Sequence, residues 1–421
     1  MKKIISLMMV LLLTPILISC SSSGSDSNAD NEDVVELDFF HRWPNEPRKS
    51  FYDKKIKEFE DEHPDIKINV NSVLNDSYKE KIKVLVSGND IPDVFTSWSD
   101  SFAKNLVSSD QIMSLDDVMD DDKEWSNKIL ESQLSGFTFD DTVYGIPFTV
   151  DGKAFFYNKD IFEENNITPP ETYDELIKIF DKLQSVGYET PIIEGLSDKW
   201  AISHYLGTIF QRIVDPDVIE QDYDKDTAKF EDQGYIEGLN VFKELTDYMG
   251  DISTAIDHEE ARNMFASGEV PIIYMQFAEI KLVEDMEQID FDFFDFPEFK
   301  DGKGDPTVLT GAPEGWMLSK DAPPEAVEFL KFLTSEETAY EFTETDGQLN
   351  AIEGAVTEDN TSKTSVNAYK IIQEASSTAP WFDNAVNINI ADIFMRGSQS
   401  LATGETTPED IISEVQKALD D

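Results

Sequence analysis

Short apolar runs alternate with helical repeats in the first part of the chain. Alternating apolar and polar residues are typical of a half-buried strand, and apolar residues three and four positions apart are typical of a helix. On this basis the chain is predicted to form, in order, a strand at 34–40, a helix at 47–63, a strand at 66–70, a helix at 78–87 and a strand at 91–95. Strands and helices in this order predict an open α/β sheet.

A second series of elements begins within residues 143–176. A short buried strand is predicted at 153–157, and two prolines then interrupt the chain. Thr172 stands three residues before Glu175, which is the spacing of a capping box, so a helix is predicted at 174–186. A new helix-bearing lobe is therefore expected to begin here.

Five stretches of the chain, taken in order, resemble the family-1 extracellular solute-binding proteins of bacterial ABC importers, the maltose-binding-protein-like family. They read F-E-D-E-H-P-D-I-K-I-N-V from Phe59, S-G-N-D-I-P-D-V-F from Ser87, Y-G-I-P-F with P-P-E-T-Y-D-E-L from Tyr144, F-A-S-G-E-V-P-I-I-Y-M from Phe265, and M-L-S-K with E-A-V-E-F-L-K-F-L from Met317. The segment before Trp316, G-A-P-E-G, departs slightly from the small-residue pair that the family has there.

The resemblance implies an α/β, periplasmic-binding-protein-like fold, in which two α/β lobes joined by three hinge crossings close on a ligand. It also implies how the chain is divided. Residues 34–148 and 277–312 are expected in lobe 1, and residues 149–276 and 313–421 in lobe 2.

Residues 1–19 have the form of a lipoprotein signal peptide. Two lysines precede an apolar run that is too short to span a membrane. The run ends in L-I-S-C, which resembles a lipobox with cleavage before Cys20 and a lipid on its thiol. The alternative is a soluble secretory signal with a chance cysteine. We expect an extracytoplasmic protein that is lipid-anchored to the cell membrane through a disordered tether at 20–33.

The composition is strongly acidic, with 86 Asp and Glu against 34 Lys and Arg and a net charge of −52. Such a surface repels nucleic acid and anionic lipid, so no nucleic-acid partner is expected. The acidic residues are spread along the whole chain. Our hypothesis is that they keep the protein soluble in salty or alkaline surroundings. Cys20 is the single cysteine, so no disulfide within the chain is possible.

Two residues near the end of the third predicted strand are candidates for ligand contact. Trp98 offers a flat face that can stack on a sugar ring, and Asp100 offers a carboxylate that accepts hydrogen bonds from hydroxyl groups. The alternative is a core tryptophan and a helix-capping aspartate. Trp43 follows the first predicted strand, where ligands bind in open α/β sheets.

The resemblance adds further candidates for ligand contact. Asp151 stands at the first crossing, Trp200 at a helix start, and Gln276 at the end of a strand. The full set of candidates is Trp43, Trp98, Asp100, Asp151, Trp200, Gln276, Phe277, Trp316, Trp381 and Asp383. No Arg or Lys recurs at these positions, which disfavours a phosphorylated or strongly anionic ligand. Aromatic faces with carboxylates favour a neutral mono- or oligosaccharide, and a polyol or a cationic osmolyte is the alternative.

The resemblance implies a binding role, in which the closed protein delivers its sugar to a membrane permease and works as a monomer. A carbohydrate-active hydrolase is the main alternative class, and a surface adhesin is another. Carboxylate pairs arise by chance in so acidic a chain, so they are no evidence for glycoside hydrolysis. No catalytic motif is present, and the four scattered histidines have no metal-binding spacing. No enzyme activity and no cofactor are expected.

One acidic loop has part of a calcium-binding pattern. Asp222, Asp224 and Asp226 alternate as at the start of an EF-hand loop. Position six of that pattern is Thr227 instead of Gly, and position twelve is Gln233 instead of Glu. The sequence therefore predicts a solvated loop and no metal site.

Overall fold

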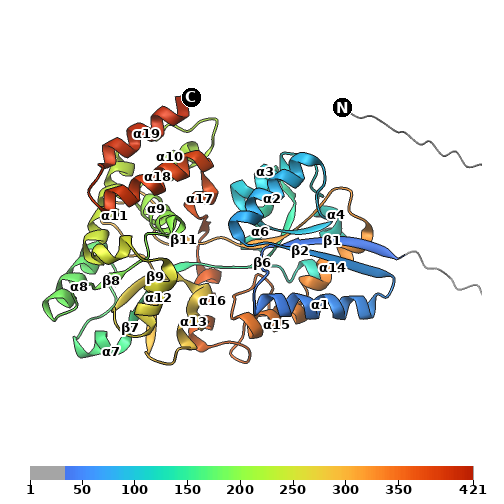
Figure 1. Cartoon of the computed structure of the whole chain (residues 1–421), viewed down its shortest axis with the longest axis horizontal. Helices are drawn as coiled ribbons and strands as arrows, with labels where there is room; N and C mark the ends of the chain where they lie inside the picture. The colour runs from blue at the N-terminus through green and yellow to red at the C-terminus, as the bar shows by residue number, and fades with distance from the viewer. Residues whose placement is uncertain (1–33, 421) are drawn as a thin grey trace, which may run out of the picture.

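The computed structural model describes residues 34–420, which form two lobes side by side (Figure 1). The predicted signal peptide at 1–19 and the tether at 20–33, with Cys20, lie outside the described residues. Among residues 34–420, no helix is long and apolar enough to cross a membrane.

Lobe 1 is built on a five-stranded sheet with the strand order β2-β1-β3-β12-β6. Its strands are β1 (Val35–His41), β2 (Ile66–Ser72), β3 (Val94–Trp98), β6 (Gly145–Thr149) and β12 (Glu314–Leu318). The first three strands are parallel, and β12 runs antiparallel between β3 and β6. A short hairpin of two two-residue strands, β4 (Thr138–Phe139) and β5 (Thr142–Val143), forms a separate pair before β6.

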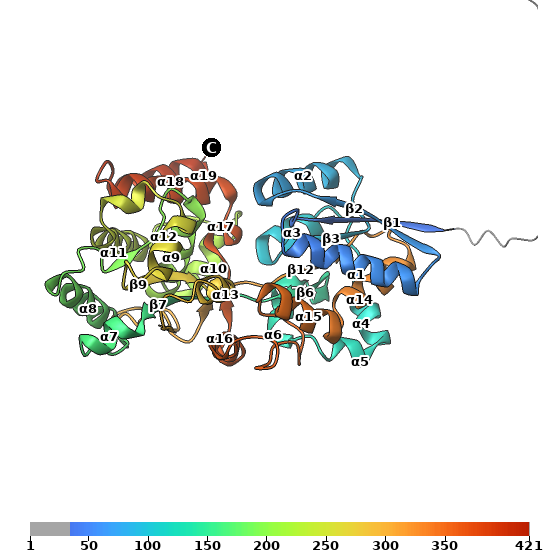
Figure 2. The same cartoon turned by 60° about the horizontal axis from the view of Figure 1, so that its bottom comes forward.

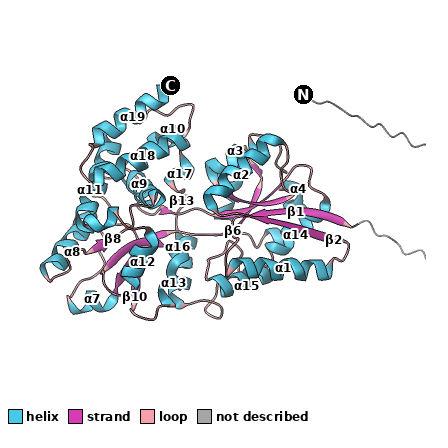
Figure 3. Cartoon of the chain, in the orientation of Figure 1, coloured by secondary structure: helices cyan, strands magenta, loops and turns pink. Residues whose placement is uncertain are grey.

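Helices cover both faces of the lobe 1 sheet (Figure 3). They are α1 (Arg48–Glu62), α2 (Asn75–Gly88), α3 (Asp100–Val107), α4 (Asp116–Asp121), α5 (Lys123–Ser126), α6 (Glu131–Leu134), η1 (Ser135–Phe137), α14 (Pro324–Leu333) and α15 (Glu336–Asp346). The core on the α1 and α14 side is aromatic, because Phe39, Tyr52, Trp316 and Phe329 pack against one another there. This packing joins the last strand of the lobe to the first.

Lobe 2 is built on a four-stranded sheet with the order β10-β7-β9-β8. Its strands are β7 (Lys153–Asn158), β8 (Ile192–Ile193), β9 (Ile272–Gln276) and β10 (Phe291–Phe294). A separate two-stranded pair joins β11 (Leu309–Thr310) to β13 (Thr378–Ala379). All five residues of β9 except Gln276 are buried, as expected of a central strand with helices on both faces.

The helices of lobe 2 form two groups with separate cores. They are α7 (Lys159–Glu164), α8 (Tyr173–Ser185), α9 (Lys199–Ile213), α10 (Pro216–Tyr223), α11 (Gln233–Met249), η2 (Asp251–Thr254), α12 (His258–Ala266), η3 (Phe277–Glu279), α13 (Ile280–Glu284), α16 (Lys363–Glu374), α17 (Phe382–Ala385), α18 (Ile388–Ala402) and α19 (Pro408–Asp420). Residues of α8, α9, α11 and α18 share one core, and residues of α12, α13 and α16 share another. In Figure 1, α9 and α18 lie above β9, and α12 and α13 lie below it; Figure 2 shows the same lobe turned by 60°.

The chain passes between the lobes three times. The first crossing is 150–152, between β6 and β7, and the second is 311–313, between β11 and β12. The third is 347–362, between α15 and α16. The first and third run together: the Val150 N–H donates to the Leu349 carbonyl at 3.1 Å, and the Ala351 N–H donates to the Phe148 carbonyl at 2.7 Å.

The expected division of the chain is wrong beyond residue 276. Residues 277–312 were assigned to lobe 1, but β10 pairs antiparallel with β7, so this segment stays in lobe 2. Residues 313–421 were assigned wholly to lobe 2, but β12 pairs with β3 and the helices α14 and α15 pack on lobe 1. The second and third crossings therefore lie later in the chain than the resemblance implied.

Local predictions agree better with the structure. The Thr172 hydroxyl accepts from the Glu175 N–H, and the Glu175 carboxylate accepts from the Thr172 N–H, so the predicted capping box is present at the start of α8.

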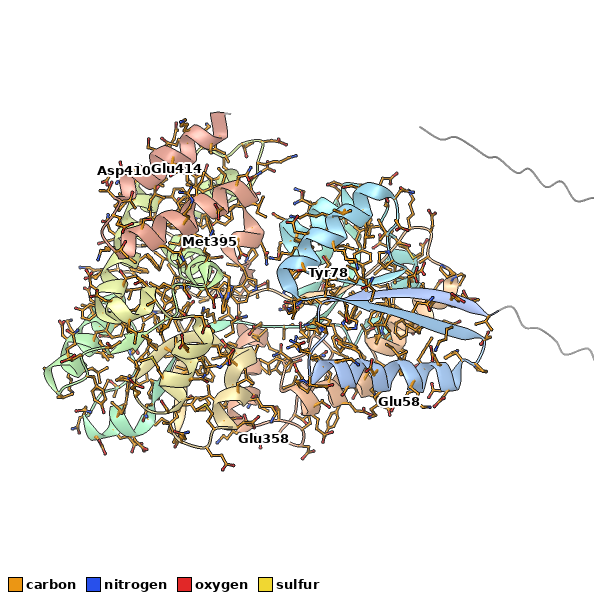
Figure 4. All side chains as sticks on the ribbon, in the orientation of Figure 1. Glu58, Tyr78, Glu358, Met395, Asp410 and Glu414 are labelled. Carbon is orange, nitrogen blue, oxygen red and sulfur yellow. The ribbon has the colours of Figure 1, made fainter. Side chains whose placement is uncertain are left out.

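Acidic side chains lie on the outer surfaces of both lobes, for example Glu58 on α1 and Asp410 and Glu414 on α19 (Figure 4).

The closeness of the crossings makes Gly311 a sensitive position. A Cβ atom on Gly311 would lie 2.1 Å from the Asp151 carbonyl oxygen, which is a backbone atom and cannot move aside easily. Gly311→Ala is therefore expected to lower the free energy of unfolding by about 3 kcal/mol, measured by urea denaturation.

Gly88→Ala is the matched control, because Gly88 ends α2 and a Cβ there would meet no atom within 4 Å. It should leave stability unchanged or raise it by roughly 0.5–1 kcal/mol. Equal stability of the two variants would show that the crossings are not tightly packed.

Candidate functional site

A cleft of about 430 Å³ lies between the lobes beside the three crossings. Its lining includes residues of the crossings or next to them, namely Thr149, Asp151, Ala312 and Gln348. Volumes of this size are typical of sites for small molecules. The cleft is therefore the candidate ligand site.

Two arginines from lobe 1 line the cleft, and each is paired with a carboxylate. The Arg42 guanidinium donates to Glu314 from Nε at 3.1 Å and from a terminal nitrogen at 2.6 Å. Arg48 Nε donates to the Asp346 carboxylate at 2.8 Å. Forked pairs of this kind fix the side chains and balance their charges.

The lobe 2 wall contains a histidine held between two carboxylates. His258 Nδ1 lies 2.6 Å from Glu194 Oε1, and His258 Nε2 lies 2.8 Å from Glu279 Oε2. Arg262 donates to Glu279 Oε1 at 2.8 Å, so this carboxylate has two cationic partners. His258, Arg262 and Glu279 all line the cleft.

The surroundings of His258 determine its charge. Burial alone would lower its pKa, but the carboxylates of Glu194 and Glu279 outweigh burial and raise the pKa to about 9. Burial would raise the pKa of Glu279, but His258 and Arg262 lower it to about 2. The imidazolium and the carboxylate are therefore both charged at neutral pH.

Asp151 joins the first crossing to lobe 2. Its carboxylate accepts from the Gly152 N–H at 2.8 Å, the Ala278 N–H at 3.1 Å and Gln276 Nε2 at 2.6 Å. Burial raises the pKa of Asp151 to about 7 despite these three hydrogen bonds. This hydrogen-bonded group holds the start of the crossing against the end of β9.

Two tryptophan rings of lobe 2 line the cleft. Trp381 stacks on the His204 ring, with 4.0 Å between ring centroids and 21° between planes. Trp200 at the start of α9 meets His204 and His258 edge to face, at 5.1 and 4.7 Å between centroids. The cleft thus combines flat apolar faces with paired charges.

The lobes also touch each other at α17, next to Trp381. Lys79 of α2 donates to Asn384 Oδ1 at 3.2 Å and lies 3.9 Å from the Asp383 carboxylate. Ser101 of α3 donates to the Ala385 carbonyl at 2.9 Å. These contacts join helices of lobe 1 to the segment that follows a cleft tryptophan.

The structure brings four of the sequence candidates together: Asp151, Trp200, Gln276 and Trp381 line the cleft. Two others are core residues, since Phe277 and Trp316 are each 1% exposed. Both residues belong to apolar runs next to the crossings. Sequence alone does not distinguish a core residue in such a run from a residue that contacts the ligand.

The remaining four candidates lie near the cleft but do not line it. Trp43 and Trp98 are buried behind Arg42, whose guanidinium carbon lies 4.9 and 5.0 Å from their ring centroids. Asp100 begins α3 and accepts from the Ser99 hydroxyl, and Asp383 accepts from the Ser203 hydroxyl.

Sequence reasoning missed the cationic residues of the cleft. It noted no recurring Arg or Lys at the candidate positions, whereas Arg42, Arg48 and Arg262 line the cleft. One signal was available for Arg42, which directly follows the first strand, at the edge where ligands bind in such sheets. No sequence signal identified Arg262 or His258, because their partners are distant in the chain.

Comparisons with known proteins agree on one kind of protein. A family model of bacterial extracellular solute-binding proteins matches residues 43–340. An uncharacterized ABC transporter extracellular-binding protein of Pyrococcus horikoshii is 26% identical over 317 residues, which are 72% of this chain and 70% of that protein. The melibiose/raffinose/stachyose-binding protein of Bacillus subtilis is 24% identical over 97% of this chain and 93% of that protein.

A solved structure of a chitin oligosaccharide binding protein has the same fold. Its TM-score is 0.80 at 23% identity, and the match covers 92% of this chain and 98% of that chain. Within residues 34–420, no group of three or more His, Cys, Asp and Glu side chains is arranged to hold a metal ion.

The charged state of His258 predicts a loss of stability in alkali. Its pKa of about 9 in the folded protein exceeds the ordinary value of 6.5, so its stabilising effect is complete below pH 6.5 and is lost as the pH rises through 9. As the pH rises from about 7.5 to 10, deprotonation of His258 should lower the free energy of unfolding by on the order of 2 kcal/mol.

His258→Gln should remove that part of the pH dependence in urea denaturation series at several pH values. His63→Gln is the control, because His63 is partly exposed on lobe 1, 3.7 Å from Glu328. Parallel pH curves for wild type and His258→Gln would contradict a charged His258.

Proposed function

The chain belongs to the bacterial extracellular solute-binding proteins, and we propose from this premise that its cleft captures a neutral mono- or oligosaccharide outside the cell membrane. In this proposal the lobes close on the sugar, and the closed monomer delivers it to the permease of an ABC importer. Relatives named for the sugars that they bind support the choice of ligand class.

One observation carries the proposal: the cleft presents arginines paired with carboxylates beside two tryptophan faces. A sugar hydroxyl both donates and accepts hydrogen bonds, so it can bridge an Arg N–H and a carboxylate oxygen of one pair. The apolar C–H face of the sugar ring packs on an indole. We propose Trp200, Trp381, Asp151 and Gln276 as ligand contacts, with Arg42 and Glu314 facing them from lobe 1.

The charges of the cleft also argue against other ligands. Each of the three cleft arginines already donates to a carboxylate, so a phosphorylated ligand would have to displace that carboxylate to bind the guanidinium. A cationic osmolyte could use the aromatic rings but would approach the same three arginines. A neutral polyol satisfies the same hydrogen bonds as a sugar but offers less flat apolar surface for the tryptophans.

A binding role is favoured over catalysis because the family and its structural neighbours are substrate-binding proteins. The cleft carboxylates of Glu279 and Glu314 are engaged by arginines. A general acid in a glycosidase needs a raised pKa. Burial raises the pKa of Asp151 to about 7, but its carboxyl oxygens already accept hydrogen bonds from Gly152, Ala278 and Gln276. We propose that the protein releases its sugar unchanged. Incubation with labelled oligosaccharides, followed by chromatography of the products, would reveal hydrolysis.

A screen of sugars, polyols and betaines by thermal shift should identify the ligand, because a compound that binds only the folded state raises its stability. With that ligand, Trp200→Ala should weaken binding by roughly tenfold to hundredfold in calorimetric titration, the effect of losing about 1.5–3 kcal/mol.

Trp125→Ala is the matched control for this measurement. Trp125 is also partly buried, but it lies in α5 of lobe 1 and donates its indole N–H to Thr334 at 3.0 Å. It should change stability and leave affinity unchanged. Equal affinity of Trp200→Ala and wild type would show that Trp200 does not contact the ligand. Stabilisation by betaines alone would show that the ligand is a cation and not a sugar.

We further propose that Cys20 carries a lipid that holds the protein at the cell membrane. Support comes from the L-I-S-C motif after an apolar run. Cys20→Ala should move the protein from the membrane fraction to the soluble fraction, measured by immunoblotting after a salt wash. A variant that stays with the membrane after the wash would contradict the lipid anchor.

A further inference from the structure

The two cleft tryptophans contact two histidines, one neutral and one positively charged. The neutral ring of His204 stacks under Trp381, and the imidazolium of His258 meets the edge of Trp200. Burial lowers the pKa of His204 well below its ordinary value, and Lys153 adds to this effect. Each tryptophan therefore contacts a histidine ring whose protonation state is set by its surroundings.

Both histidines are tied to one buried ion pair. Lys153 Nζ lies 3.7 Å from Glu194 Oε2, and both side chains are 0% exposed. The same Nζ lies 3.3 Å from His204 Nδ1, and the other oxygen of Glu194 lies 2.6 Å from His258 Nδ1. The ammonium group also lies 5.5 Å from the centroid of the Trp200 ring.

The chemistry of these groups fixes the state of His204. Burial lowers the pKa of Lys153, while the carboxylates of Glu194, Glu279 and Asp151 favour its charged form. A charged ammonium group only donates, so beside charged Lys153 the neutral His204 ring accepts at Nδ1 and carries its proton on Nε2.

The charged groups that act on His204 come from three elements: Lys153 on β7, His258 on α12 and Lys79 on α2. All three are cationic and favour the neutral ring.

We propose that Lys153 is a positioning residue for ligand binding, which holds His204 in one tautomer under Trp381 and, through Glu194, holds His258 against Trp200. It contacts no ligand itself. The proposal rests on the proposed function of the cleft and adds that both indole faces are oriented before the ligand arrives. Such preorganisation strengthens binding because less conformational freedom is lost on association.

Stability alone does not explain a buried lysine at this position. Removing two charges from water costs energy that their attraction often only offsets, and apolar replacements of buried ion pairs are commonly as stable. Lys153 also opens β7 directly after the first crossing, so the support of the rings begins at the hinge itself.

Nuclear magnetic resonance of the ligand-free protein tests the proposal. The chemical shifts of the histidine ring nitrogens report the tautomer of His204, and the His204→Phe variant assigns the signals of that ring. The indole N–H signals report the surroundings of Trp200 and Trp381. Lys153→Met should change the His204 tautomer from Nε2–H alone to a mixture, and should shift or broaden both indole signals. Lys199→Met is the matched control, because Lys199 is 45% exposed and pairs with Asp392; it should leave all of these signals unchanged.

A folded Lys153→Met variant with the wild-type tautomer and indole signals would overturn the proposal. If the single variant fails to fold, Lys153→Met with Glu194→Gln removes both charges together and is judged by the same signals. With a sugar found by the thermal-shift screen, Lys153→Met should also weaken binding, by roughly tenfold. If no sugar binds the wild type, the proposed sugar-binding function is wrong. The magnetic resonance signals of the ligand-free protein still test the role of Lys153.

Discussion

Close backbone contact at the crossings determines how the two lobes face each other. Gly311 lies so near the Asp151 carbonyl that no side chain fits between them, and the third crossing bonds to the first at Val150 and Ala351. Three chain segments therefore behave as one narrow bundle. Asp151 extends this bundle into lobe 2 by accepting from Gln276 and the Ala278 N–H, so the hinge and the cleft share a residue.

The cleft presents its arginines in contact with carboxylates. Arg42 pairs with Glu314, Arg48 with Asp346 and Arg262 with Glu279, while the whole chain has a net charge of −52. An isolated charge in the cleft would favour ions of the opposite sign, whereas a pair presents a donor and an acceptor side by side. The acidic surface thus affects solubility, whereas the paired groups of the cleft affect which ligand binds.

The fold was largely predictable from the sequence, and the site only in part. Strand and helix periodicity identified the early elements, and Thr172 with Glu175 identified the start of α8, because these signals are local. The lobe assignment of residues 277–312 failed, because the pairing of β10 with β7 joins segments far apart in the chain. His258 and Arg262 were not predicted as cleft residues for the same reason, since their place in the cleft depends on contacts with the distant residues Glu279 and Glu194.

The contacts at α17 differ in how strongly dissolved salt affects them. Lys79 and Asp383 are each more than 20% exposed, so dissolved ions screen their attraction over a distance of ~10 Å at 0.1 M salt and ~3 Å at 1 M. The hydrogen bond from Ser101 to the Ala385 carbonyl joins uncharged groups and is little affected. Higher salt should therefore weaken the attraction between Lys79 and Asp383, while the hydrogen bonds from Lys79 to Asn384 and from Ser101 to the Ala385 carbonyl continue to join α2 and α3 to α17.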